Sequence, residues 1–254
     1  MPRLLVALAV LIVIVGVGGG AYIWSRGGFD RPFATTSSAA PSGVTATNPF
    51  GTSRDPNDPG EQHYIHGRYP EAIALWRAEA ARGNTQAAHR LGVEYMDGKR
   101  WVVGEGCAAP RCPDYSQAMQ YHRQAALGGN ALSMFDMGSL YEYGLGVEKN
   151  LVEAARWYGH AARYGLAQGQ YNYATMLEAG EGLAKDEIEA YKFFVLAARN
   201  GFTGVPYDNQ RFLIDKNAPT PVELLQRKLT MAQLREGQER ADAFQPTSGP
   251  LAPG

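Results

Sequence analysis

The two cysteines, Cys107 and Cys112, are the residues whose type and spacing most directly suggest chemistry. Four residues separate them, and Pro110 limits the shapes available to the loop between them. In an exported domain this pair predicts a disulfide that closes a short loop. In a cytoplasmic domain the same two residues would remain free thiols.

Histidine is the other residue type that could hold a metal, and the sequence contains five histidines. A zinc site at the cysteine pair would need two more ligands, and His89 and His122 are the candidates. Their spacing matches no zinc signature. The remaining histidines, His63, His66 and His160, complete no HExxH motif. We therefore predict no metal site and no cofactor, and we expect ordinary helical roles for the histidines.

Catalytic motifs are also missing from the sequence. There is no GxSxG nucleophile elbow and no phosphate-binding loop. The glycines at positions 16, 18, 19 and 20 lie inside an apolar segment, so they are no nucleotide fingerprint. We predict no catalytic residues and a protein that is not an enzyme.

Composition narrows the class of protein further. The 254 residues carry a net charge of -1, whereas a nucleic-acid-binding protein should show a clear basic excess. The charged fraction of 19% is too low for a wholly disordered chain. We predict protein partners, no nucleic acid and no small-molecule substrate.

The N-terminal region predicts a membrane segment. Leu4 to Trp24 contains no charge, and as a helix of 21 residues it is about 31 Å long, enough to cross a bilayer core of about 30 Å. We expect residues 1–25 to form an uncleaved anchor. A cleaved signal peptide, with Gly19 and Ala21 before the cut, is the main alternative, and a buried core helix is the second.

The side of the membrane is weakly specified, because basic residues flank both ends of the apolar segment. The cysteine pair favours export of the bulk. We therefore predict a single-pass inner-membrane protein with its bulk in the periplasm, or a periplasmic or secreted protein if the segment is cleaved.

Two further segments lack any helical or strand period. Residues 26–60 are rich in Gly, Pro, Ser, Thr and Ala, which is typical of a flexible tether. Residues 244–254 hold several prolines and glycines and predict a disordered tail.

The middle of the chain repeats. Pairs of alanines recur at 80–81, 125–126, 161–162 and 197–198, with spacings of 45, 36 and 36 residues. An aromatic residue stands four positions before the first alanine of each pair: Trp76, Tyr121, Trp157 and Phe193. A second series of small residues is spaced by 46 and 36 residues: Gly92, Gly138 and Ala174. Repeats of this length predict stacked helical units that bury their apolar faces against each other.

Each unit predicts two helices with a glycine-containing turn between them. Gly144 and Gly180 follow the first helix of two units, where a left-handed backbone would end the helix. The second helix opens with a capping pair in three units: Asp114 with Gln117, Asn150 with Glu153, and Asp186 with Glu189. We expect the first member to accept from a free backbone N–H and the second to reach back to the cap.

These residues resemble Sel1-like repeats, which are relatives of tetratricopeptide repeats. The resemblance rests on Met137-Gly138-x-x-Tyr141, on the loop Gly144-x-Gly146-Val147 and on Ala154-x-x-Trp157-Tyr158, and it covers about Gln62 to Ala243. It implies an all-α fold: a right-handed α-solenoid of helix-turn-helix repeats over residues 61–201. A stretch of capping helices would follow in 202–243, where Thr220, Pro221 and Glu223 form a capping motif. Ten extra residues that include the cysteines are expected to form a loop.

The resemblance also implies a binding surface, because the first helix of each tetratricopeptide pair lines the concave groove. By register, the predicted groove residues are Gln86, His89, Val93, Leu132, Phe135, Ser139, Glu142, Gln168, Tyr171, Thr175 and Glu178. The middle row would be His89, Phe135 and Tyr171. The alternative is that Phe135 and Tyr171 pack between helices as core residues.

Relatives of this kind act mostly as scaffolds in bacterial envelope processes, so the resemblance implies an adaptor for signalling, motility or export. Two alternatives remain at this stage. One is an enzyme that binds or hydrolyses cell-wall or β-lactam compounds, as credited to cysteine-rich relatives. The other is a structural subunit of a membrane complex.

Overall fold

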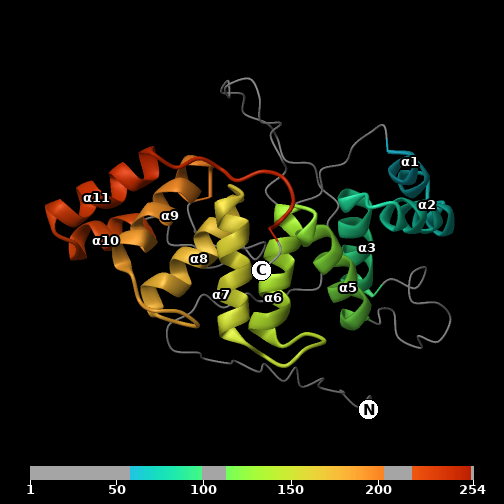
Figure 1. Cartoon of the computed structure of the whole chain (residues 1–254), viewed down its shortest axis with the longest axis horizontal. Helices are drawn as coiled ribbons and strands as arrows, with labels where there is room; N and C mark the ends of the chain where they lie inside the picture. Colours follow the sequence, from blue (N-terminus) through green and yellow to red (C-terminus); the bar gives the residue numbers. More distant parts are fainter. Residues whose placement is uncertain (1–57, 99–112, 203–218, 253–254) are drawn as a thin grey trace, which may run out of the picture. The chain divides into compact units, whose positions relative to one another are not determined.

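A computed structural model describes residues 58–98, 113–202 and 219–252. Within these ranges every regular element is an α-helix (Figure 1). The helices are α1 (Pro59–Ile65), α2 (Tyr69–Ala81), α3 (Thr85–Asp97), α5 (Tyr115–Leu127), α6 (Ala131–Tyr143), α7 (Leu151–Arg163), α8 (Ala167–Ala179), α9 (Glu187–Arg199), α10 (Pro221–Lys228) and α11 (Met231–Asp242). The predicted all-α fold is confirmed.

The helices pack in chain order as pairs. α3 lies against α5, α6 against α7 and α8 against α9, while α5–α6 and α7–α8 contacts join one pair to the next. On the N-terminal side α1 packs on α2 and α2 packs on α3, and α10 and α11 pack on α9. The predicted array of helix-turn-helix repeats is therefore confirmed over α3–α9.

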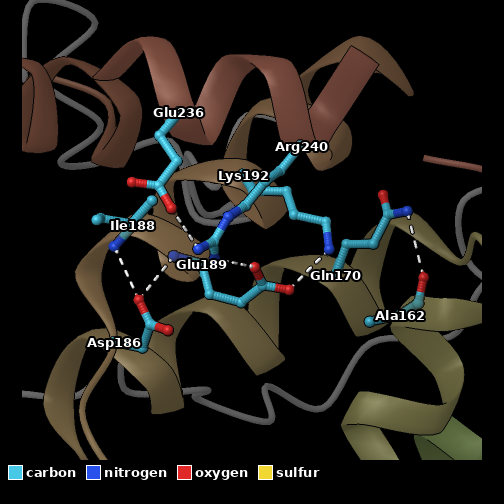
Figure 2. Close-up of polar contacts among 8 residues, drawn as sticks. All are labelled: Ala162, Gln170, Asp186, Ile188, Glu189, Lys192, Glu236 and Arg240. Atoms are coloured by element: carbon cyan, nitrogen blue, oxygen red, sulfur yellow. Dashed lines mark hydrogen bonds and ion pairs between the residues drawn. The ribbon is translucent and has the colours of Figure 1, made fainter. Parts of the chain in front are cut away.

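Local sequence explains where the second helix of each pair begins. Asn150 Oδ1 accepts from Val152 and Glu153 N–H, and Asp186 caps α9 in the same way (Figure 2). The sequence predicts that the Glu153 and Glu189 side chains reach back to the backbone N–H of the capping residue, but in the structure that N–H bonds elsewhere. The backbone N–H of Asn150 donates to Tyr141 O at 2.9 Å, and that of Asp186 donates to Leu177 O at 3.0 Å. Because the cap N–H is already satisfied, the Glu153 side chain pairs with Arg156 instead.

The turn after the first helix depends on glycine. Gly144 and Gly180 have φ values of 68° and 77°, which lie in the left-handed region, and their N–H groups donate back to the preceding turn. This geometry favours glycine because it has no Cβ. The ten-residue insertion does not disturb the register, since Asp114 N donates to Tyr95 O at 3.0 Å as Asn150 does to Tyr141.

Small residues and large aromatic residues alternate in the core. Ala126, Ala161 and Ala162 have no exposed surface, and Trp76 and Trp157 are 1% and 6% exposed. The small side chains let neighbouring helices approach, and the aromatic rings fill the remaining space between layers. The alanine and aromatic series of the sequence is therefore the packing series of the repeats.

The C-terminal segment forms two separate helices that pack on the last repeat. Thr220 forms the predicted capping box with Glu223, and a second box at Thr230 starts a new helix. Ala232, in the first turn of α11, is exposed to solvent. The buried small residues of this helix are Gly237 and Ala241. Glu189 on α9 accepts from Lys192 and from Arg240, which ties α11 to the last repeat (Figure 2).

The segment after α11 differs from the predicted disordered tail at 244–254. Phe244 packs edge-on against Phe193, with ring centroids 6.3 Å apart. Thr247 N donates to Arg163 O at 2.8 Å, and Leu251 N donates to Leu127 O at 2.9 Å. The aromatic and leucine side chains and these backbone bonds give the tail specific contacts despite its prolines and glycines.

Several predictions fall on residues outside the described ranges. They are the anchor at Leu4–Trp24, most of the tether and the Cys107–Cys112 pair. The tether was expected to extend to residue 60, but α1 already begins at Pro59, with Asp58 accepting from Gly60 N. None of the helices in the described ranges has the length and apolar character needed to cross a bilayer.

Candidate protein-binding surface

The predicted groove residues come from equivalent positions on α3, α6 and α8. All of them except His89 are partly exposed. The remaining ten are Gln86 and Val93 on α3, Leu132, Phe135, Ser139 and Glu142 on α6, and Gln168, Tyr171, Thr175 and Glu178 on α8. The three helices thus offer a mixed polar, aliphatic and aromatic set of side chains.

Phe135 and Tyr171, from the middle row of the predicted groove, are partly exposed and partly packed against the core. Phe135 lies 5.4 Å from the ring of Tyr158 and packs against two core clusters, yet it keeps part of its surface exposed. Tyr171 contacts the rings of Phe194 and Phe202 at 5.3 Å each. Both residues therefore pack against core residues and keep part of their surface exposed.

A hydrogen-bond network holds the α6 part of this surface. The Tyr158 hydroxyl on α7 donates to Glu142 Oε2 at 2.6 Å and lies 3.0 Å from Ser139 Oγ. Burial, followed by the Glu142 carboxylate, raises the pKa of Tyr158 well above its usual value. The phenol therefore stays protonated and fixes the Glu142 side chain. On α8, Thr175 Oγ1 donates to Tyr171 O at 3.0 Å.

His89 differs from the prediction that it lines the groove. It is only 3% exposed, and its Nδ1 lies 2.9 Å from Ser133 Oγ on α6. The ring points between the helices, where a second imidazole, His122 of α5, lies 5.5 Å away by ring centroids. His89 is therefore unavailable to a partner in this structure.

The structure brings together a polar cluster that the sequence analysis missed: His89, His122, Ser133 and Asp136. Asp136 Oδ2 lies 3.3 Å from His122 Nδ1 and 3.5 Å from His89 Nδ1. Burial raises the pKa of Asp136 to about 7. Burial, and then the neighbouring His89, lower the pKa of His122 well below its usual value.

Register could have found this cluster. His122 stands 36 residues before Tyr158 and 72 before Phe194, and His89 occupies the position of Phe135 and Tyr171. His89 was assigned to the groove by register, whereas His122 was considered only by its spacing along the chain, so the two were not recognised as a pair. Alignment of the repeats would have identified them as a pair at a position where the other repeats carry two aromatic rings.

A comparison with protein-family models matches this architecture. The family model described as Sel1 repeat matches residues 85–130, 131–165 and 167–202, which contain the pairs α3–α5, α6–α7 and α8–α9. A search of the curated proteins gave no match.

Among solved structures, the chain is similar to a Sel1 repeat protein from Oxalobacter formigenes, with 28% identity over 56% of this chain and a TM-score of 0.49. The match covers 54% of that protein, so the chain spans about half of its length. The chain is also similar to c5321, a protective antigen of uropathogenic Escherichia coli strains that displays an SLR fold. That match has 19% identity, 69% and 41% coverage of the two chains and a TM-score of 0.43. Helicobacter pylori cysteine rich protein B matches with 21% identity, 46% and 91% coverage and a TM-score of 0.35.

Proposed function

Because this chain is a Sel1 repeat protein, we propose that it works as a protein-binding scaffold through the exposed faces of α3, α6 and α8. Sel1 repeats typically mediate protein–protein interactions. We call the ten partly exposed residues on these helices the repeat surface. In this proposal the protein performs no catalysis, and its specificity comes from the shape and side chains of that surface.

The observation that carries the proposal is the mixture of fixed and adaptable groups on the repeat surface. The Phe135 ring is anchored by Tyr158, and the Glu142 carboxylate is held by the Tyr158 hydroxyl. Rigid aromatic groups lose little conformational entropy on binding and dominate many protein interfaces. Around them, Leu132 and Gln168 offer apolar and amide contacts that can adapt to a bound segment.

The location of the scaffold is part of the same proposal. The uncharged segment from Leu4 to Trp24 would anchor the chain in the inner membrane, with the repeats in the periplasm. The predicted tether of residues 26–60 would keep the repeats near the membrane and raise the effective concentration of membrane partners. The proposal includes a role in signalling, motility or export at the cell envelope, as the resemblance to envelope scaffolds implies.

In-cell photocrosslinking tests the proposed surface. A benzophenone amino acid would replace Leu132, and separately Val152, which is 62% exposed on α7 and lies outside the repeat surface. We expect a discrete protein product from position 132, weakened by Gln168→Arg, and no such product from position 152. Products of equal yield from both positions, or none from position 132 in a folded protein, would reject the repeat surface.

Topology has its own measurement. A reporter that is active only outside the cytoplasm, fused after Gly254, should be active if the repeats lie in the periplasm. Activity from a cytoplasm-specific reporter at the same place would contradict the proposed location and leave the binding proposal to the crosslinking result.

A further inference from the structure

The polar cluster between the first two repeats draws its side chains from three helices. His89 comes from α3, His122 from α5, and Ser133 and Asp136 from α6. His122 has no exposed surface, and His89 is 3% exposed. One nitrogen from each histidine and one oxygen of Asp136 all lie within 4.8 Å of one another.

Hydrogen bonding within the cluster leaves the Asp136 Oδ2 atom without a partner. Ser133 Oγ lies 2.9 Å from His89 Nδ1 and 3.2 Å from His122 Nδ1, but a hydroxyl has one proton to donate. Asp136 Oδ2 is buried without a hydrogen bond, although the same two nitrogens lie 3.5 Å and 3.3 Å away. A cation bound by the carboxylate and the two imidazoles would satisfy this buried oxygen, and buried polar groups are usually paired.

Packing alone does not require polar groups at this position. The equivalent pairs in the next repeats are Phe135–Tyr158 and Tyr171–Phe194, with ring centroids 5.4 Å and 5.3 Å apart. The His89–His122 distance of 5.5 Å is nearly the same. Aromatic rings therefore fill this position in the later repeats, and the nitrogens of the first repeat call for a different explanation.

We propose that His89 Nδ1, His122 Nδ1 and Asp136 Oδ2 bind a divalent transition-metal cation, with Zn²⁺ the best match. Tetrahedral ligands about 2.0–2.1 Å from zinc are about 3.3–3.4 Å apart. The two nitrogen–oxygen distances, 3.3 Å and 3.5 Å, lie close to that edge length. Imidazole and carboxylate ligands suit zinc and its neighbours in the first transition row.

The surroundings agree with this ligand set. The Nε2 edge of the His122 ring lies against Gly92, where a Cβ would come within 2.6 Å of Nε2, so Nδ1 is the nitrogen that faces the cluster. Ser133 Oγ or a water would complete the coordination. The Asp136 side chain is 21% exposed, which gives an ion a path from solvent.

A metal at this position would join the first repeat to the second. Its ligands connect α3 and α5 with α6, directly beside Phe135 on the repeat surface. The cation would act as a structural joint that fixes the relative position of the two repeats, and it would not require a catalytic role.

Metal titration tests the proposal on the full chain in mild detergent, after chelation and removal of the chelator. The protein should carry Cys107→Ser and Cys112→Ser, because thiols also bind zinc. We expect one Zn²⁺ per chain by calorimetry, a rise in Tm with Zn²⁺, and the visible absorption of tetrahedral Co²⁺ when cobalt replaces zinc.

The matched variant is His89→Phe with His122→Tyr, which copies the Phe135–Tyr158 pair of the second repeat. It should keep the helical circular dichroism and bind Zn²⁺ more than about 100-fold more weakly, since even outer-shell changes cost 10–100-fold. Asp136→Asn, which copies Asn172 of the third repeat, provides a second test with little change of shape. Failure of the parent protein to bind, or equal binding by the parent and both variants, would overturn the proposal.

Discussion

The first repeat differs from the two that follow in the pair of rings that meet between its two helices. In the second and third repeats, aromatic rings from the two helices of a pair meet: Phe135 with Tyr158, and Tyr171 with Phe194. In the first repeat two imidazoles meet at the same separation. The comparison teaches that the repeat specifies the size and place of a ring pair, while the chemistry of the rings can change.

The polar residue that the following repeat places beside each ring pair also differs. Asp136, beside the histidines, corresponds by register to Asn172, which hydrogen bonds to the Tyr158 hydroxyl. The polar partner is thus a carboxylate where it faces two imidazoles and a neutral amide where it faces a phenol. This pairing of residue types supports a charged species between the histidines.

The largest effect is expected from Tyr158→Ala in the second repeat. Tyr158 is 1% exposed, and its loss would leave a cavity and remove the hydroxyl that holds Glu142. Removal of a buried aromatic ring costs about 3–5 kcal/mol of unfolding free energy. Urea denaturation measures this loss. Val152→Ala, at an exposed site, serves as the control and should change the stability by less than about 0.5 kcal/mol.

A smaller loss is expected when a methyl group is added beside the same ring. A Cβ at Gly138 would lie 2.5 Å from the Tyr158 ring, so Gly138→Ala must displace it. Overpacking of this kind costs about 1–3 kcal/mol. The third repeat carries the buried Ala174 at this position, so Ala174→Gly is the informative converse. A stabilising Gly138→Ala would show that the ring can move freely.

Removal of only the Tyr158 hydroxyl separates packing from hydrogen bonding. Tyr158→Phe keeps the ring contact with Phe135 and loses the bonds to Glu142 and Ser139. A typical hydrogen bond contributes about 0.5–1.5 kcal/mol, and the partly exposed partners can bond to water instead, so the total loss should fall in this range in denaturant unfolding. A loss as large as that of Tyr158→Ala would instead make the network, and not the ring, the main stabilising feature.

The smallest effect on stability is expected when the first repeat receives the aromatic pair. Without metal, His89→Phe with His122→Tyr should leave the Tm unchanged or raise it, because apolar replacement of buried polar groups is often neutral or stabilising. Thermal melts in the presence of a chelator measure it. A strong decrease in Tm would mean that the first repeat cannot accept the rings of the second.

Sequence reasoning succeeded where neighbours along the chain decide the outcome. The Asn150 and Asp186 caps and the glycine turn at Gly144 are confirmed, because each depends on residues within about one turn of helix. The return bonds of the caps were wrong for a non-local reason: Tyr141 O and Leu177 O, from the preceding helix, take the N–H groups first.

The candidate sites required more than local pattern. The residues of the repeat surface followed from register, but His89 was misplaced because its burial depends on what faces it. The His89–His122–Asp136 cluster joins residues up to 47 positions apart across an insertion, so no motif spacing records it. The tail contacts of Phe244 and Leu251 likewise depend on distant partners in α9 and at the end of α5.

The amino-acid sequence specifies the helices, the residues that cap them, their glycine turns and their repeat, since a period of small and aromatic residues permits few other ways to bury apolar surface. Which of the equivalent side chains face solvent, and which face each other, depends on how the helices pack. The physical reason is that burial and electrostatics depend on the neighbouring helix, and in the first repeat that neighbour supplies Ser133 and Asp136 to two imidazoles.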